Sequence, residues 1–532
     1  MSEITVKESK PWKSYQKILF RIAFIFFIAI SIPNSVEWYK FVVNIDWTNL
    51  HYRDLYDIAR FGSGLNIFGN SIFGSSLSGY ANWVITLIAA TIVGLIWTFI
   101  DSRRKNQPKE YNLLYYWLRV VVRYRAGIGI IGFGFTKLLP LQLPYPSLGI
   151  LNTDFGDLTA QKIYWLQIGI VPWYEVFAGI VEVTAGALLF FRKTTLLGSV
   201  LLFGALADIV YVNFAYDGGV HVYSSYFVLL SGFLIIQYVP QLYQLLILEK
   251  RTLPNYYYPS LSKPWQKYSR IGLKTAVIGI FLVLFFYLQL VNFLYDPYKQ
   301  PATKGVTALR GSYNVTEFKV NGKEIAYSPL DSVRWSEATF ENWTTLTYKV
   351  NRAVPLDLSN GGGDPQRDIN RTFELAGVGG GRRVFHYFAD TTEHTLYLQD
   401  KYKEMADRRN VTAGAGGDGG AEQQRPKEKV DPKKTGGIYS DDWISRQALA
   451  HIGDENKMID DRAASTRRDR DFASVKGYDK RNRMLLNYET ADGRHVILKG
   501  LNEEQDSIYV VLDRVDRQYA LSKSTLNAGK YE

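Results

Sequence analysis

Four apolar spans between Trp117 and Leu242 carry charged residues, and this combination constrains the possible fold more than any other feature. Each span is close to the ~20 residues that an α-helix needs to cross the core of a membrane. Lys137, Glu175, Glu182 and Asp208 lie inside these spans or at their ends. An unpaired charge at that depth costs at least ~2.5 kcal/mol. The sequence therefore predicts a helix bundle that turns these side chains toward one another.

Three further apolar runs, at 18–32, 81–100 and 271–294, bring the predicted number of transmembrane helices to seven. The first run follows four lysines and lacks a small-x-small cleavage site, so we interpret it as a retained signal anchor. The aromatic segment 34–80 is expected to lie along the outer interface of the membrane.

Charge and sequence period divide the chain into four parts. Residues 1–112 contain the first two helices, 113–248 form a four-helix core, 249–295 hold a basic loop and the seventh helix, and 296–532 form a soluble domain. If the N-terminus is cytoplasmic, the inner segments have sixteen basic residues and the outer ones four. The positive-inside rule then predicts a cytoplasmic N-terminus and an extracytoplasmic C-terminal domain.

Residues after 295 follow the period of β-strands. TLTYKVN places Leu346, Tyr348 and Val350 on one face, and two strand pairs surround the Asn321-Gly322 and Asp492-Gly493 turns. Repeated hairpins predict an antiparallel sandwich or barrel. The glycine-rich stretch 410–437 has the composition of a flexible insertion, and 441–462 reads as a polar helix pair.

Composition excludes several classes of chemistry. The chain has no cysteine and only six histidines, of which only His221 lies near the membrane block. A thiol centre, a bis-histidine haem within the bundle and a multi-histidine metal site are therefore not expected. Motifs for nucleotide, zinc-protease or serine-hydrolase chemistry are missing, and the glycine cluster 377–381 is expected to be a plain loop. The net charge of +11 fits basic membrane loops, so we expect no nucleic-acid partner.

Polar residues of the four-helix core gather toward one side of the membrane in the predicted orientation. Glu175 and Glu182 are seven residues apart and share a helix face. Lys137 either pairs with a glutamate to hold helices together or belongs to a pocket for an amphiphile or a proton-coupled headgroup. The candidate pocket consists of Lys137, Glu175, Glu182, Asp208, Asn213, Asp217 and His221.

The run from Arg119 to Pro240 resembles the DoxX family of small bacterial membrane proteins. The motifs are GFGFTKLLPLQLPYPS, GIVPWYEVFAGIVEVTAGALLFFRKTTLLGS and NFAYDGGVHVYSS. The resemblance rests on Lys137, Glu175, Glu182, Arg192, Thr195, Asn213 and Asp217. It implies a four-helix core in the bacterial inner membrane and an accessory role in a quinone-linked or other redox complex. Related sequences have YDVPVK where this chain has YDGGVH, with His221 in the basic position.

The architecture also has a weaker likeness to the HTTM membrane domain of vitamin K-dependent carboxylase. Two function classes therefore stay open. One is a non-catalytic subunit whose β domain, 296–532, docks a periplasmic partner; the other is an enzyme that acts on a lipid-soluble substrate. No cofactor is predicted, although a quinone or another lipid is a candidate ligand.

The predicted topology is testable with single cysteines because the chain has none of its own. In intact cells, a membrane-impermeant maleimide is expected to label Ser507→Cys and to leave Ser260→Cys unlabelled. The opposite pattern would reverse the orientation.

Overall fold

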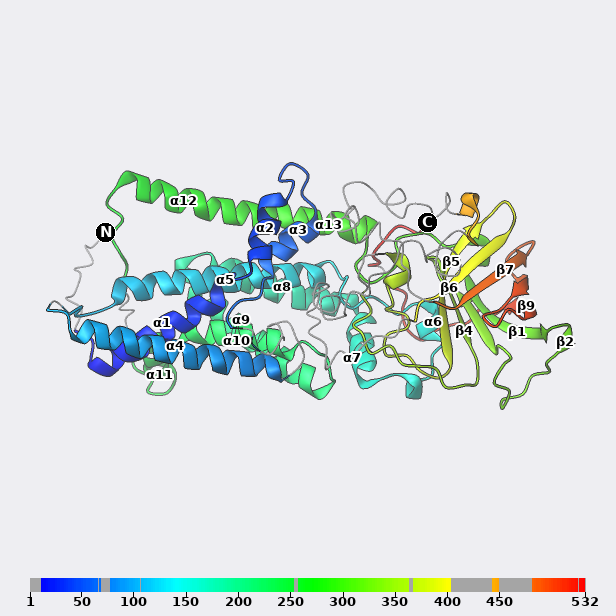
Figure 1. Cartoon of the computed structure of the whole chain (residues 1–532), viewed down its shortest axis with the longest axis horizontal. Coiled ribbons are helices and arrows are strands. Elements are labelled where there is room, and N and C mark those ends of the chain that lie inside the picture. Colours follow the sequence, from blue (N-terminus) through cyan, green and yellow to red (C-terminus); the bar gives the residue numbers. More distant parts are fainter. Residues whose placement is uncertain are drawn as a thin grey trace.

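The computed structural model describes residues 11–65, 67, 77–105, 107–252, 257–362, 367–402, 443–448, 481–524 and 526–531. A bundle of helices and a β-barrel lie end to end along the long axis of the molecule (Figure 1). The predicted insertion 410–437 and most of the predicted helix pair 441–462 fall outside the described residues.

The helical half contains long helices joined by short ones. They are α1 (Ser14–Ser31), α2 (Val36–Asn44), α3 (Tyr52–Ala59), α4 (Ser78–Ser102), α5 (Asn112–Leu138), α6 (Leu148–Leu151), α7 (Ala160–Gly169), α8 (Pro172–Leu189), α9 (Thr195–Ala215), α10 (His221–Ile236), α11 (Val239–Leu246), α12 (Pro264–Ile278) and α13 (Phe285–Tyr295). Short 3-10 helices η1 (Phe155–Asp157) and η2 (Arg192–Thr194) precede α7 and α9, and the π-helical turn η3 (Gly279–Leu284) joins α12 to α13. Two more 3-10 turns, η4 (Thr307–Leu309) and η5 (Asp368–Asn370), belong to the C-terminal half.

Four helical stretches among the described residues are long and apolar enough to cross a membrane: Ser14–Ser31, Gly79–Ser102, Arg192–Ala215 and Pro264–Tyr295. Two bent pairs, α7 with α8 (89°) and α10 with α11 (74°), raise the number to six if each pair is one span. These helices suggest a membrane-embedded region. Helix α5, the third span of the sequence prediction, is not among them, because it carries four basic residues along its length. The count of seven stays a prediction.

Helix α5 is the centre of the bundle, because it packs against α1, α3, α8, α10 and α13. Two buried arginines, Arg21 and Arg125, connect helices of the bundle. Arg21 of α1 forms a buried ion pair with Asp101 of α4 at 2.8 Å, and the Tyr111 hydroxyl donates to the same carboxylate at 2.6 Å. Arg125 of α5 donates to the Ala59 carbonyl at 2.9 Å. It thereby anchors α3, which is largely buried in the bundle.

The C-terminal half contains a closed antiparallel barrel of eight strands. The strands are β1 (Gly311–Val320), β3 (Glu337–Phe340), β4 (Thr345–Lys349), β5 (Arg382–Asp390), β6 (Thr395–Asp400), β7 (Arg483–Glu489), β8 (His495–Leu501) and β9 (Ser507–Arg514), with the two-residue β2 (Lys323–Glu324) added at one edge. Strand β1 closes the barrel because it pairs with both β3 and β9. A barrel, rather than a sandwich, is thus the form that the predicted hairpins take.

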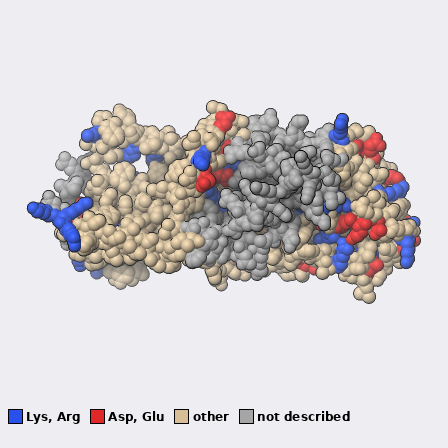
Figure 2. Space-filling model, in the orientation of Figure 1, with Lys and Arg blue, Asp and Glu red and all other residues tan. Residues whose placement is uncertain are grey.

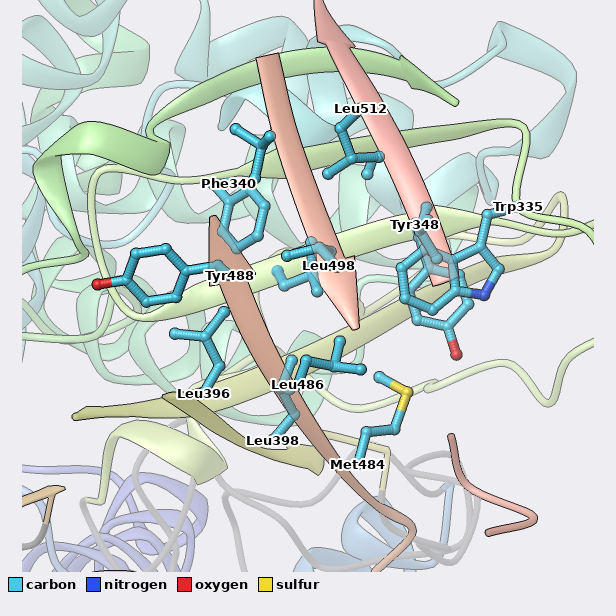
Figure 3. Close-up of a cluster of buried hydrophobic side chains, with 14 of the residues drawn as sticks. Trp335, Phe340, Tyr348, Leu396, Leu398, Met484, Leu486, Tyr488, Leu498 and Leu512 are labelled. Carbon is cyan, nitrogen blue, oxygen red and sulfur yellow. The ribbon is translucent and has the colours of Figure 1, made fainter. Parts of the chain in front are cut away.

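Side chains that alternate along these strands fill the barrel (Figure 3). Leu346, Tyr348 and Val350 are buried there together, which confirms the predicted face of this strand. The Trp335 ring stacks on Tyr348 with 3.9 Å between the ring centroids. The Asn321-Gly322 turn has positive φ at both residues (51° and 77°), as this dipeptide predicts.

The segment between α5 and α8 joins the two halves. Residues 139–170 form α6, η1 and α7; α7 lies between bundle and barrel (Figure 1), and α6 packs against β1 and β3. The backbone N–H groups of Leu148 and Gly149 donate to the Glu341 carboxylate at 3.0 and 2.8 Å. The Lys162 ammonium is fully buried, donates to the Phe373 carbonyl and lies 3.7 Å from the Phe373 ring centroid.

The glycine cluster 377–381 is part of this joint. The Gly379 N–H donates to the Asp157 carbonyl at 2.8 Å, and the Thr159 N–H donates to the Gly377 carbonyl at 3.0 Å. Gly380 has a φ of 67°, and a Cβ there would lie 1.9 Å from an Asp157 carboxylate oxygen. Close backbone approach therefore explains the cluster, as expected for a plain loop.

The pH dependence of stability tests the joint at Glu341. Burial raises the pKa of this carboxyl from 4.5 to about 7. Because the folded state then holds a proton that the unfolded state releases, stability falls as pH rises from about 4.5 to 7. The Glu341→Gln side chain resembles the protonated acid and does not titrate. The variant therefore lacks this pH-dependent loss of stability, which amounts to at most ~3 kcal/mol in the parent. Thermal melting of the purified chain is expected to show the variant gaining on the parent between pH 5 and 8.

The exposed Glu504 provides a matched control. Glu504→Gln should follow the parent at every pH. A Glu341→Gln curve parallel to that of the parent would contradict a raised pKa.

Candidate functional site

A cavity of about 290 Å³ lies where the bundle meets the barrel. Helices α3, α5, α7, α8 and α9 contribute to its wall, together with the chain after α13 and a loop of the barrel domain. Its polar lining consists of Tyr56, Thr136, Lys137, Gln142, Tyr164, Tyr174, Glu175, Glu182, Asp208, Asn213, Tyr298, Lys299 and Asn360. The rest of the lining is mainly apolar and includes Phe133, Phe177, Val181 and Ile209.

Lys137 of α5 forms an ion pair with Glu182 of α8, so the predicted lysine–glutamate pair exists. Both side chains are shielded from solvent, with exposures of 13% and 2%. The two helices approach closely because small residues face each other: a Cβ on Gly179 would lie 2.2 Å from the Leu138 nitrogen. One Glu182 oxygen, Oε2, is buried without a hydrogen-bond partner among the described residues.

Glu175 lies in the first turn of α8 and is 1% exposed. Its Oε1 accepts a hydrogen bond from the Leu143 N–H at 3.1 Å. Its Oε2 is buried, and no described residue provides a partner. Glu175 and Glu182 line the same cavity, as their shared helix face predicts. Each thus keeps one carboxylate oxygen without a hydrogen-bond partner among the described residues.

Helix α9 provides Asp208 and Asn213 to the lining. Asn213 also shapes the following turn, because its Nδ2 donates to the Ile209 carbonyl at 2.7 Å and its Oδ1 accepts from the Val220 N–H at 3.3 Å. Five of the seven predicted pocket residues therefore meet in one cavity.

The remaining two predicted residues, Asp217 and His221, are not part of the lining. Asp217 adopts a positive φ of 53° in the turn after α9. The His221 ring stacks on Phe214 with 4.2 Å between the centroids, and its Nδ1 lies 3.3 Å from the Tyr80 hydroxyl. The aromatic stack accounts for its position beside the cavity rather than in it.

Sequence analysis missed Lys299, which is 4% exposed and places its ammonium 4.2 Å from the Trp165 ring centroid. It also missed Asn360, which reaches the cavity from a loop of the barrel domain. Lys299 follows the seventh predicted span by a few residues, at the same membrane side as Glu175 in the predicted topology. This position in the predicted topology could have identified Lys299 as a candidate pocket residue. Nothing in the sequence indicated that the Asn360 loop folds back over the bundle.

The arrangement combines two lysines, three carboxylates and several phenols around a partly apolar space. It can donate hydrogen bonds to an uncharged polar head and exchange protons with it, while the apolar wall accepts hydrocarbon. Within the part of the chain that the structure describes, no group of three or more His, Asp or Glu side chains could hold a metal ion.

No family model matches the chain, and neither a curated protein nor a solved structure matches it.

The ion pair can be tested by charge removal. Because breaking a buried pair leaves its partner charge uncompensated at a cost of about 3–5 kcal/mol, Lys137→Met is expected to reduce folded yield. Glu182→Gln should do the same, and the double variant should recover part of the loss. Size-exclusion chromatography and thermal melting measure these effects.

Lys193→Met, an exposed change of the same type at the far end of the bundle, is the control. If Glu182→Gln folds normally but loses a bound ligand, the pair serves binding rather than folding. Parent-like behaviour of both single variants in folding and binding would remove the pair from the site.

Proposed function

We propose that this chain is a DoxX-like integral membrane subunit of a bacterial cell-envelope complex, and that its cavity binds the polar head of a lipid-soluble molecule such as a quinone. The observation that carries the proposal is the cavity with its buried, incompletely partnered carboxylates. Four of the seven residues on which the resemblance rests, namely Lys137, Glu175, Glu182 and Asn213, line it.

The chemistry of the lining fits a quinone head. A quinone presents two carbonyl acceptors and takes up protons when it is reduced. Lys299 and a protonated Glu175 can donate hydrogen bonds to such carbonyls, and Glu182 can pass a proton. Phe177 and Ile209 provide the apolar surface for the ring and the first part of its tail.

The position of the cavity supports an envelope role. In the orientation that the basic loops favour, the cavity lies near the outer surface of the inner membrane, and the barrel extends into the periplasm. The barrel is then placed to dock a periplasmic partner, while the bundle provides access for a lipid-soluble ligand from the membrane. The N-in, C-out topology is part of the proposal.

A membrane enzyme acting on a lipid-soluble substrate is the second candidate. The specific observation in its favour is that Glu175 and Glu182 each keep one buried oxygen without a described partner. Such carboxylates can act as general acid and base. The likeness to HTTM and vitamin K-dependent carboxylase belongs to this alternative. Turnover of the bound molecule by the purified chain alone would favour it over an accessory role.

Binding of menaquinone-4 to the full chain in detergent tests the proposal. Trp165 lines the cavity, so saturable quenching of tryptophan fluorescence is expected. Glu175→Leu is expected to weaken binding by about threefold to tenfold, because it removes the hydrogen-bond donor and a hydrogen bond between neutral groups is worth about 0.5–1.5 kcal/mol.

Glu249→Leu, the same chemical change at an exposed site after α11, should bind like the parent. Mass spectrometry of an organic extract and of copurified proteins complements the titration. A stoichiometric protein partner supports the subunit role. Absence of both saturable binding and any extractable lipid-soluble molecule would refute the cavity as a quinone site.

A further inference from the structure

A second cluster of charge lies at the end of the bundle that is distant from the barrel. We call it the basic cluster, and it consists of Arg119 and Arg123 of α5, Arg192 of η2, and Arg270 and Lys274 of α12. These residues are far apart in sequence, and contacts to the chain around η2 connect them: Lys274 lies over the Phe191 ring, and Arg123 donates to Thr195.

The contacts of the cluster are to neutral groups. Arg123 donates to the Thr195 hydroxyl at 3.3 Å, and Arg119 donates to the Leu234 carbonyl at 2.9 Å. The Arg192 guanidinium lies 3.9 Å from the Tyr258 ring centroid. The Lys274 ammonium lies 3.7 Å from the Phe191 ring centroid.

The cations are also close enough to repel one another. Arg119 acts electrostatically on Arg123, and both Arg123 and Arg270 act on Lys274. Tyr258 is within reach of both Arg192 and Arg119. One connected group of like charges therefore extends across three helical elements.

No acidic side chain among the described residues forms an ion pair with any member of the cluster. Two other cations of the bundle differ in this respect, since Arg21 pairs with Asp101 and Lys137 pairs with Glu182. The Arg123 Nε is in addition buried without a hydrogen-bond partner in the described part of the chain. Like charges held together without a counter-charge destabilise a fold, so an anion from outside the chain would stabilise this one.

Helix α12 leaves the cluster accessible. No residue of α12 is buried, and the helix runs along the side of the bundle (Figure 1). The face shown in Figure 2 carries Lys and Arg at this end of the bundle but no Asp or Glu. Apolar residues of α12 such as Ile271 and Leu273 are exposed beside the cations. Cations next to exposed apolar surface match the layout of a phospholipid, with its anionic head and hydrocarbon tails.

We propose that the basic cluster is a binding site for a phosphate group, supplied in the membrane by the head of an anionic phospholipid. Guanidinium groups suit this ligand, because their fixed donors match phosphate oxygens. In the orientation proposed above the site lies in the cytoplasmic leaflet. It is independent of the quinone cavity, which lies at the other end of the bundle.

The test compares lipids on the delipidated full chain in detergent. Thermal melting and native mass spectrometry are run with dioleoylphosphatidylglycerol, with dioleoylphosphatidylcholine and with inorganic phosphate. We expect phosphatidylglycerol to bind and to raise the melting temperature, less so at high salt. Arg123→Gln and Arg192→Gln should each weaken binding by about fivefold.

Arg103→Gln is the charge-matched control, because Arg103 is exposed near the end of α4 and contacts the Phe99 ring. Stabilisation by inorganic phosphate but not by phosphatidylglycerol would assign the site to a soluble phosphate. Equal binding of both lipids, or no stabilisation by any of the three ligands, would overturn the proposal. If the variants do not fold, the comparison of the three ligands on the parent chain decides.

Discussion

The cost of placing charge among apolar helices governs this structure. The bundle contains buried arginine, lysine and glutamate side chains, and packing brings each of the best-defined ones to a partner. Arg21 meets Asp101, Lys137 meets Glu182, and Arg125 meets backbone carbonyls. These contacts connect α1 to α4, α5 to α8, and α5 to α3, so they specify which helices are neighbours. A purely apolar bundle would lack that specification, because hydrocarbon contacts have no direction.

The same constraint explains the joint with the barrel. Lys162 and Glu341 are buried outside the bundle, and each finds partners on the opposite half: Lys162 at Phe373, and Glu341 at the backbone N–H groups of Leu148 and Gly149. Bundle and barrel therefore share buried polar contacts rather than a flexible linker. Both halves contribute residues to the lining of the cavity at this joint. The lining therefore combines apolar surface with ionisable groups. A site of this kind suits a molecule that is itself part polar and part hydrocarbon.

Because charge without a partner is costly, the places where charge stays unpaired indicate where ligands bind. The basic cluster has no described carboxylate partner, whereas the buried ion pairs of the bundle are neutralised within the chain. Two carboxylate oxygens in the cavity are likewise unsatisfied. Since buried polar atoms are nearly always partnered in native proteins, these oxygens and the buried Arg123 Nε support a ligand at each of the two places. The two places lie at opposite ends of the bundle and suit different ligands. The basic cluster suits an anion, and the cavity suits a molecule with carbonyl groups that accept hydrogen bonds.

Local pattern determined much of this from sequence alone. Alternation along TLTYKVN determined which face of β4 is buried, the Asn321-Gly322 pair determined a hairpin, and seven-residue spacing put Glu175 and Glu182 on one face, because each signal acts within a single element. Tertiary structure alone decided what depends on distant segments. It chose a closed barrel through the double pairing of β1, selected Glu182 as the partner of Lys137, and brought Lys299 and Asn360 to the cavity. It placed His221 in an aromatic stack instead. Such choices follow from packing between elements, for which one sequence carries no local signal.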